Sequence, residues 1–83
     1  MRYVLYHATW CPFCRVFAPI FRKHIPEGEE VLLDDEHDTR WTELNIEYVP
    51  TIIAYDGKKE VKRLQAVPHK GITEDMLKGF MEE

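Results

Sequence analysis

The sequence lacks several features that would place it in a broad class of proteins. No apolar run approaches the ~20 residues that a membrane-spanning helix needs. The first residues also lack the apolar segment of a secretory signal. Internal repeats, linkers and low-complexity tracts are missing as well. We therefore expect one domain over residues 1–83, without a membrane partner and located in the cytoplasm.

An excess of basic residues is also missing. The 83 residues include 11 lysines and arginines against 15 acidic residues, which gives a formal net charge of −4 at pH 7. Proteins that bind nucleic acid use Lys and Arg to neutralise phosphates, so this balance argues against a nucleic-acid partner. A chain of this length buries roughly 60–65% of its unfolded surface, which is enough for one modest core. We expect it to act as a monomer.

Cysteine is scarce, and both copies lie in the segment Trp10-Cys11-Pro12-Phe13-Cys14. Two residues separate them, which lets the sulfurs approach each other across one helical turn. A disulfide stabilises a fold most when it closes a long loop, so this small ring would be a poor structural bridge. The spacing instead favours a disulfide that forms and opens reversibly.

Two other readings of the cysteine pair stay open. The first is half of a structural zinc site, which normally takes four Cys or His ligands. The histidines are scattered, however, and none of them forms a second close pair: His7, His24, His37 and His69. The second is an inert pair that packs like small apolar residues. We expect neither a metal ion nor an organic cofactor.

Hydrophobic periodicity and turn residues predict the element order β-α-β-α-β-β-α. The second strand is apolar nearly throughout, so we expect both of its faces to be covered, as in a parallel pair. Asp56-Gly57 is a strong hairpin turn between the last two strands. The expected strands cover residues 3–8, 31–34, 51–55 and 60–66, and the helices cover residues 11–24 and 39–45 and a last segment from Thr73. The fold class is α/β, with a central four-stranded mixed sheet flanked by three helices on its two faces.

Cys11 lies where the first predicted strand gives way to the first predicted helix. The free N–H groups and the dipole at a helix start favour a negative charge, which the thiolate of Cys11 would carry. Cys14 lies one turn further into the helix and is expected to be less exposed than Cys11, which should be open to solvent. This asymmetry makes Cys11 the predicted nucleophile, which attacks a substrate disulfide. Cys14 then attacks Cys11 and releases the reduced product.

The motif resembles the active-site segment of thioredoxins in three respects: Trp10 precedes the first cysteine, Arg15 follows the second, and Pro19 lies five residues beyond it. Pro12-Phe13, between the cysteines, is similar instead to the Cys-Pro-aromatic-Cys motif of glutaredoxins. The resemblance implies a thioredoxin-like fold and a thiol-disulfide oxidoreductase. In such an enzyme Pro12 and Phe13 shape the disulfide ring and help to bind the substrate.

A second match lies far along the chain, where Val49-Pro50-Thr51 is similar to the cis-proline segment of the same superfamily. A cis X-Pro bond is uncommon and belongs to tight turns that a fold requires. The resemblance places this loop beside the cysteines, where a peptide docks like an added strand. Val49 and Pro50 would then form the substrate platform, and Trp10 would lie at its rim.

The chain also departs from both families. Thioredoxins carry a buried acid six residues before the first cysteine, where this chain has Leu5. The resolving step therefore needs another base or water; Asp34 and Asp35 are candidates, and His7 could tune the thiolate if it faces the site. Glutaredoxins hold glutathione with a Gly-Gly pair, which residues 61–70 lack.

Together these features predict a thiol-disulfide oxidoreductase that reduces or exchanges protein disulfides. Its electrons would come from a reductase or a low-molecular-weight thiol. Three alternatives remain from the sequence: a glutaredoxin-type enzyme that uses glutathione, a binding protein switched by the redox state of the cysteines, and a structural metal-binding domain.

Overall fold

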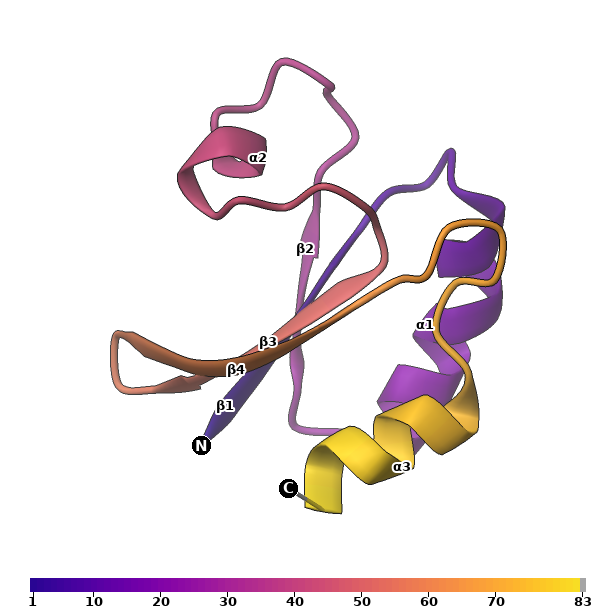
Figure 1. The fold of residues 1–83 in the computed structure, drawn as a ribbon, viewed down its shortest axis with the longest axis vertical. Helices are drawn as coiled ribbons and strands as arrows, with labels where there is room; N and C mark the ends of the chain where they lie inside the picture. Colours follow the sequence, from indigo (N-terminus) through magenta and orange to yellow (C-terminus); the bar gives the residue numbers. More distant parts are fainter. Residues whose placement is uncertain (83) are drawn as a thin grey trace.

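The computed structural model describes residues 1–82. Its seven elements follow in the predicted order β-α-β-α-β-β-α (Figure 1). They are β1 (Arg2–His7), α1 (Pro12–His24), β2 (Glu29–Leu32), α2 (Arg40–Glu43), β3 (Thr51–Asp56), β4 (Lys59–Gln65) and α3 (Glu74–Glu82). Within this part of the chain, no helix combines the length and the apolar character that crossing a bilayer requires.

The four strands form one mixed sheet in the order β2-β1-β3-β4. Strand β1 pairs in parallel with β2 and antiparallel with β3, so that Leu5 lies opposite Ile52. Strands β3 and β4 form the predicted antiparallel hairpin, and Gly57 adopts a positive φ of 62° in its turn. The α/β class and the sheet are therefore those predicted from the sequence.

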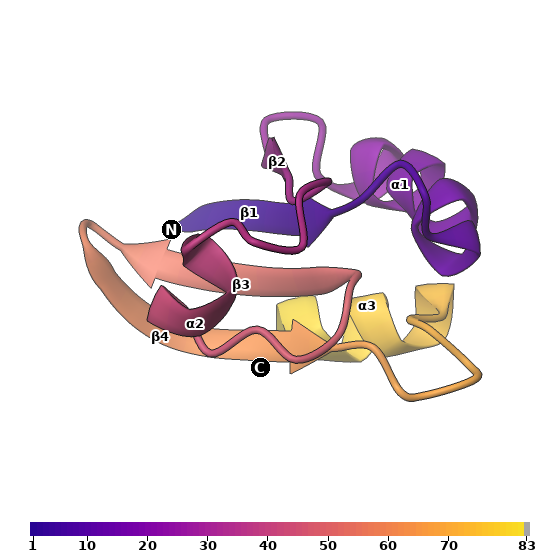
Figure 2. The same ribbon diagram turned by 90° about the horizontal axis from the view of Figure 1, so that it is seen from above.

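Helices cover both faces of the sheet, with α1 and α3 on one side and α2 on the other (Figures 1 and 2). Successive side chains of a strand point to opposite faces, which sorts the core into two clusters. The larger cluster, beneath α1 and α3, includes Leu5, Phe17, Phe21, Ile52, Leu77 and Phe80. The smaller cluster, on the side of α2, includes Val4, Tyr6, Leu33, Ile46, Ile53 and Tyr55.

The prediction for the second strand was wrong in its bounds and in its burial. Strand β2 ends at Leu32, two residues earlier than expected, and it lies at the edge of the sheet beside β1 alone. Leu32 is 47% exposed, whereas Leu33, just beyond the strand, is fully buried. The apolar run therefore reflects a residue buried in the following loop rather than a strand covered on both faces. Charged side chains at such an edge discourage pairing with other chains, and Glu29 and Glu30 begin this strand.

Helix α1 begins directly after the cysteine that precedes it. Cys11 is the N-cap residue, Pro12 occupies the first turn, and the helix continues through Pro19 to His24. Proline suits the first turn because the N–H group that it lacks would have no partner there. The buried face of the helix consists of Cys14, Phe17, Ala18 and Phe21. Burial of this face fixes the helix on the sheet and with it the position of both cysteines.

Gly79 in α3 offers a test of the last helix. A Cβ atom added there would meet nothing within 4 Å. Gly79→Ala is therefore expected to raise the free energy of unfolding by about 0.5–1 kcal/mol, because alanine loses less backbone entropy in a helix. Urea titration followed by circular dichroism measures the change. Gly57→Ala is the matched control: its Cβ would also be unobstructed, but the positive φ predicts a loss of about 1–2 kcal/mol. A destabilised Gly79→Ala variant would contradict the expectation.

Candidate active site at the cysteine pair

The first turn of α1 holds the two cysteines close together. The backbone N–H of Cys14 donates a hydrogen bond to the Cys11 Sγ over 3.3 Å. The loop before the helix is fixed by a hydrogen bond from the Cys11 N–H to the Ala8 carbonyl. A sulfur that accepts an N–H at a helix start is in the position where a thiolate is best stabilised. The local geometry therefore agrees with the predicted asymmetry between the two sulfurs.

Both cysteines are free thiols, and both are more covered than an open nucleophile would be. Cys14 is 1% exposed, and Cys11, which was expected to be open to solvent, is only 5% exposed. The order of exposure is the expected one, but the open position of Cys11 is not observed. The cause is a small apolar cluster in which both cysteines pack with Ala8 and Val49.

Burial has a direct consequence for Cys14. It raises the pKa of the Cys14 thiol to about 12, and the hydrogen bond and the charge of Cys11 add to the effect. Cys14 therefore keeps its proton at neutral pH in the reduced protein. A reaction that uses Cys14 as a nucleophile needs a group that accepts this proton.

The Val49-Pro50 loop lies beside Cys11, although 38 residues separate them in the sequence. The peptide bond between Val49 and Pro50 is cis, as the sequence predicted. The Cys11 thiol lies 3.5 Å from the Val49 carbonyl oxygen, to which it donates. Pro50 is fully buried, and its carbonyl accepts the N–H of Ala66. The predicted platform is thus anchored to the sheet and in contact with the first cysteine.

A pocket of about 360 Å³ lies against this loop. Phe13, which is 40% exposed, contributes from α1 and Val49 from the cis-proline loop. The remaining lining residues are Tyr48, Ala66, Val67, Pro68 and His69. Val67 bridges back to Gly71, so residues 67–71 form a distinct small loop. The pocket is largely apolar. Val49, which lines it, also packs against Cys11.

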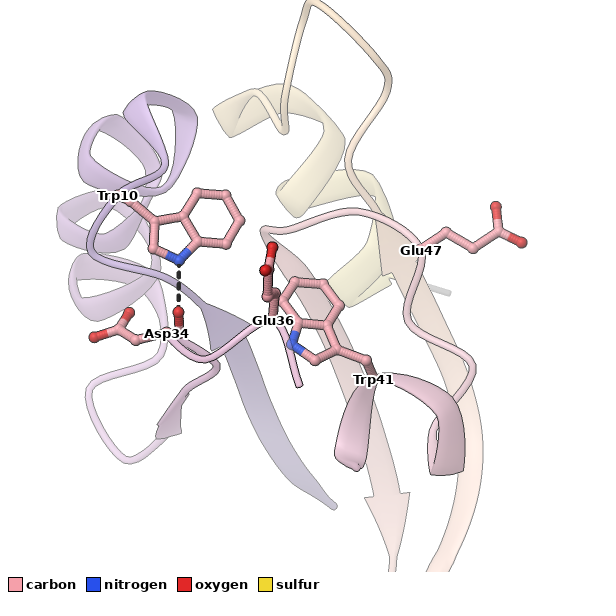
Figure 3. Close-up of a pocket in the computed structure, with 5 residues that line it drawn as sticks. All are labelled: Trp10, Asp34, Glu36, Trp41 and Glu47. Carbon is pink, nitrogen blue, oxygen red and sulfur yellow. Dashed lines mark hydrogen bonds between the residues drawn. The ribbon is translucent and has the colours of Figure 1, made fainter. Parts of the chain in front are cut away.

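Trp10 borders a different pocket, of about 680 Å³ (Figure 3). Its ring is 56% exposed and stacks with Trp41 at a distance of 6.4 Å between ring centroids. The indole N–H of Trp10 donates to the Asp34 carbonyl, and that of Trp41 donates to the Asp35 carbonyl. The sequence placed Trp10 and the Val49-Pro50 loop around a single groove, whereas the structure assigns them to separate pockets. Trp41 was missed as a site residue because its spacing to Leu44 indicated only a short helix.

Asp34 and Asp35, the candidate bases for the resolving step, form hydrogen bonds with other groups. The Asp34 carboxylate accepts the backbone N–H and the hydroxyl of Thr9, over 2.7 and 3.1 Å. In Figure 3 this carboxylate points away from Trp10. Asp35 accepts the N–H of His37. Both acids therefore shape loops around the site, and neither lines a pocket together with Cys14.

Other groups near the cysteines have structural contacts. Arg15 is exposed, and its Nε donates to the Thr9 carbonyl. Together with Asp34 it fixes the backbone just before Trp10.

Among residues 1–82, no three side chains of His, Cys, Asp or Glu gather as the ligands of a metal ion would.

The chain is similar in sequence to known proteins over most of its length. The sequence model of the family described as Thioredoxin matches residues 2–82. Thioredoxin H-type of Brassica campestris and thioredoxin H-type 1 of Brassica napus are each 29% identical over 75 residues. These alignments cover 86% of this chain and 61% of each relative, so the chain spans about three-fifths of the length of these curated proteins.

Solved structures give the same picture. Thioredoxin from Fasciola hepatica is 28% identical, with a TM-score of 0.69, and oxidised thioredoxin from Plasmodium falciparum is 25% identical, with a TM-score of 0.74. Each alignment covers 96% of this chain and 76% of the solved chain. Because the family match extends over nearly all of the sequence, the chain belongs to the thioredoxin family.

Proposed function

We propose that the chain is a thiol-disulfide oxidoreductase that reduces or exchanges disulfides in protein substrates. The observation that carries this proposal is the hydrogen bond from the Cys14 N–H to the Cys11 Sγ, at a helix start in contact with Val49. Membership of the thioredoxin family supports the same reaction class. No metal ion or organic cofactor takes part.

The reaction proceeds by two exchanges at sulfur. The thiolate of Cys11 attacks one sulfur of a substrate disulfide, the substrate S–S bond breaks, and its electron pair leaves on the other substrate sulfur. The thiolate of Cys14 then attacks the Cys11 Sγ in the mixed disulfide. The bond from Cys11 to the substrate breaks, the second substrate thiolate leaves, and a Cys11–Cys14 disulfide remains. Two electrons pass from the protein to the substrate.

The substrate segment binds along the Val49-Pro50 loop. An extended peptide can add to a backbone edge like an extra strand, and it can place a side chain in a neighbouring pocket. The apolar pocket between Phe13 and Val49 suits such a side chain. Pro12 is exposed at the first turn of α1, where it faces an incoming substrate. Trp10 and Trp41 add a second surface on which the substrate chain can extend.

Electrons return to the disulfide form from a reductase or a low-molecular-weight thiol. One similar solved structure is thioredoxin f2 in complex with ferredoxin:thioredoxin reductase. We propose that a reductase uses the same face of this chain, since it must reach the same sulfurs. In a reducing cytoplasm, the disulfide form of such a pair is reduced again to the dithiol.

The function is tested by reduction of insulin disulfides with dithiothreitol as the electron source. The protein is expected to accelerate insulin reduction well above the rate with dithiothreitol alone, and prior alkylation of its thiols removes the acceleration. An unaccelerated rate from folded protein with two free thiols would contradict the proposal and favour a redox-switched binding protein. A parallel assay with glutathione and a small mixed disulfide distinguishes the glutaredoxin-type alternative, for which activity there would exceed that on insulin.

A further inference from the structure

A third cavity, of about 280 Å³, lies between the end of β1 and α1. Cys14 lines it from α1, and His7 lines it from the end of β1. Arg15 and Arg22 contribute from α1. One water molecule occupies about 30 Å³ in the liquid, so the cavity has room for several. Apolar atoms form most of its wall, but the polar side chains of His7, Arg15 and Arg22 also line it, so solvent that enters it can connect His7 with the resolving cysteine.

His7 is buried, and within residues 1–82 one of its two ring nitrogens has no aligned hydrogen-bond partner. The residue is 8% exposed, and among the described residues its Nε2 has no hydrogen-bond partner. The Glu30 carboxylate lies 3.2 Å from the same nitrogen, measured between Nε2 and Oε1, and forms an ion pair with the ring when the ring is protonated. Buried polar atoms are paired in most native structures, so an unpaired one suggests a functional role.

Three charged groups act on His7, and they come from α1, β2 and the loop after β2. Burial lowers the pKa of His7, and Arg22 from α1 lowers it further. Glu30 from β2 and Asp34 from the following loop act in the opposite direction. Burial is the largest of these effects, so the imidazole is neutral at pH 7 and able to take up a proton.

The other groups near Cys14 are unsuited to this task. Arginine stays protonated in proteins, which excludes Arg15 and Arg22 as proton acceptors. Leu5 occupies the family's acid position and is fully buried in the main apolar cluster. The Glu30 carboxylate is held by Arg22 through two hydrogen bonds of 2.8 and 2.9 Å. Of the described residues that line this cavity, His7 alone can accept a proton near neutral pH.

We propose that His7 is the proton acceptor for Cys14 in the resolving step, through solvent held in this cavity. The inference rests on the proposed function and replaces the family's buried acid with a histidine two residues further along the same strand. The proton of the Cys14 thiol passes through water to the imidazole, and the thiolate attacks the Cys11 Sγ. The departing substrate thiolate takes up a proton from solvent, and His7 later releases its own proton to solvent.

The two steps can be observed separately with 5,5′-dithiobis(2-nitrobenzoate) in stopped-flow absorbance. Attack by Cys11 releases the first equivalent of coloured thionitrobenzoate, and attack by Cys14 on the resulting mixed disulfide releases the second. His7→Gln is expected to slow the second release at pH 7 by about 10²-fold, within the usual range for loss of a general base. The rate of the first release is expected to stay unchanged.

The pH profile separates a proton-transfer role from a structural one. In the unaltered protein the second release is expected to rise with the deprotonation of His7 and then to level off. In His7→Gln it should rise continuously with pH towards the titration of Cys14. His24→Gln is the matched control: His24 is a partly buried histidine at the end of α1 that contacts Glu74, and its profile should match that of the unaltered protein.

Each outcome decides one of the two proposals. An unchanged second release with an unchanged pH profile in His7→Gln would overturn the role of His7 while leaving the oxidoreductase intact. If the unaltered protein gives no first release and does not accelerate insulin reduction, the proposed function is overturned instead. If His7→Gln fails to fold, the titration of the His7 ring, followed by nuclear magnetic resonance in the unaltered protein, decides. The pH midpoint of this titration must coincide with the midpoint of the pH profile of the second release. A clear mismatch between the two midpoints refutes the inference.

Discussion

Cys11→Ser is expected to reduce the rate of insulin reduction to the dithiothreitol background, whereas Cys14→Ser is expected to accumulate mixed disulfides with substrate proteins. The serine hydroxyl has a similar size but is a far weaker nucleophile, so the first variant cannot begin the reaction. In the second variant Cys11 attacks as before, but the Cys14 sulfur that would displace the substrate is missing. Non-reducing gel electrophoresis detects the trapped species, and a reductant releases them.

The two variants control each other. Both replace one buried sulfur in the same turn of α1, so a general loss of stability would affect them alike. Circular dichroism checks that both are folded. Mixed disulfides in Cys11→Ser with none in Cys14→Ser would reverse the assigned roles, and no trapping in either variant would argue against a mixed-disulfide intermediate.

The cysteine motif and the element order could be predicted because they depend on local sequence. Pro12 at the first turn and the apolar spacing of Phe13, Phe17 and Phe21 indicate the helix without reference to the rest of the chain. The cis bond at Val49-Pro50 was expected from the resemblance to a cis-proline segment, and the structure contains it. Strand β2 could not be predicted as well, because the burial of Leu33 depends on the residues that it meets outside the sheet.

The features that were missed depend on contacts between distant segments. Cys11 is covered because Val49, 38 residues away, packs against it. The indoles of Trp10 and Trp41 share a pocket because the carbonyls of Asp34 and Asp35 hold both N–H groups. His7 shares a cavity with Cys14 because β1 ends beside α1. Periodicity within one element carries no information about such neighbours.

Gly28→Ala is expected to lower the free energy of unfolding by about 1–3 kcal/mol, the usual range for overpacking a core. Gly28 follows α1 in a tight turn, where its N–H donates to the Ile25 carbonyl over 2.9 Å. A Cβ atom on Gly28 would lie 2.5 Å from Cζ and 2.8 Å from Cε2 of the Phe21 ring. Phe21 is fully buried and cannot move aside without disturbing the main cluster. Urea titration measures the loss, and an unchanged midpoint would refute the clash.

A double-mutant cycle with Phe21→Leu tests whether the ring is the cause. Phe21→Leu removes ring atoms that Gly28 approaches, so the added methyl group of Gly28→Ala gains space in that background. The destabilisation by Gly28→Ala is therefore expected to shrink by at least about 1 kcal/mol, within the range for residues in contact. Additivity within about 0.5 kcal/mol, as for independent sites, would mean that the backbone of the turn and not the ring requires glycine. Because the stability of a small domain is itself only about 5–15 kcal/mol, the milder Phe21→Leu keeps every corner of the cycle folded, where Phe21→Ala would remove about 3–5 kcal/mol.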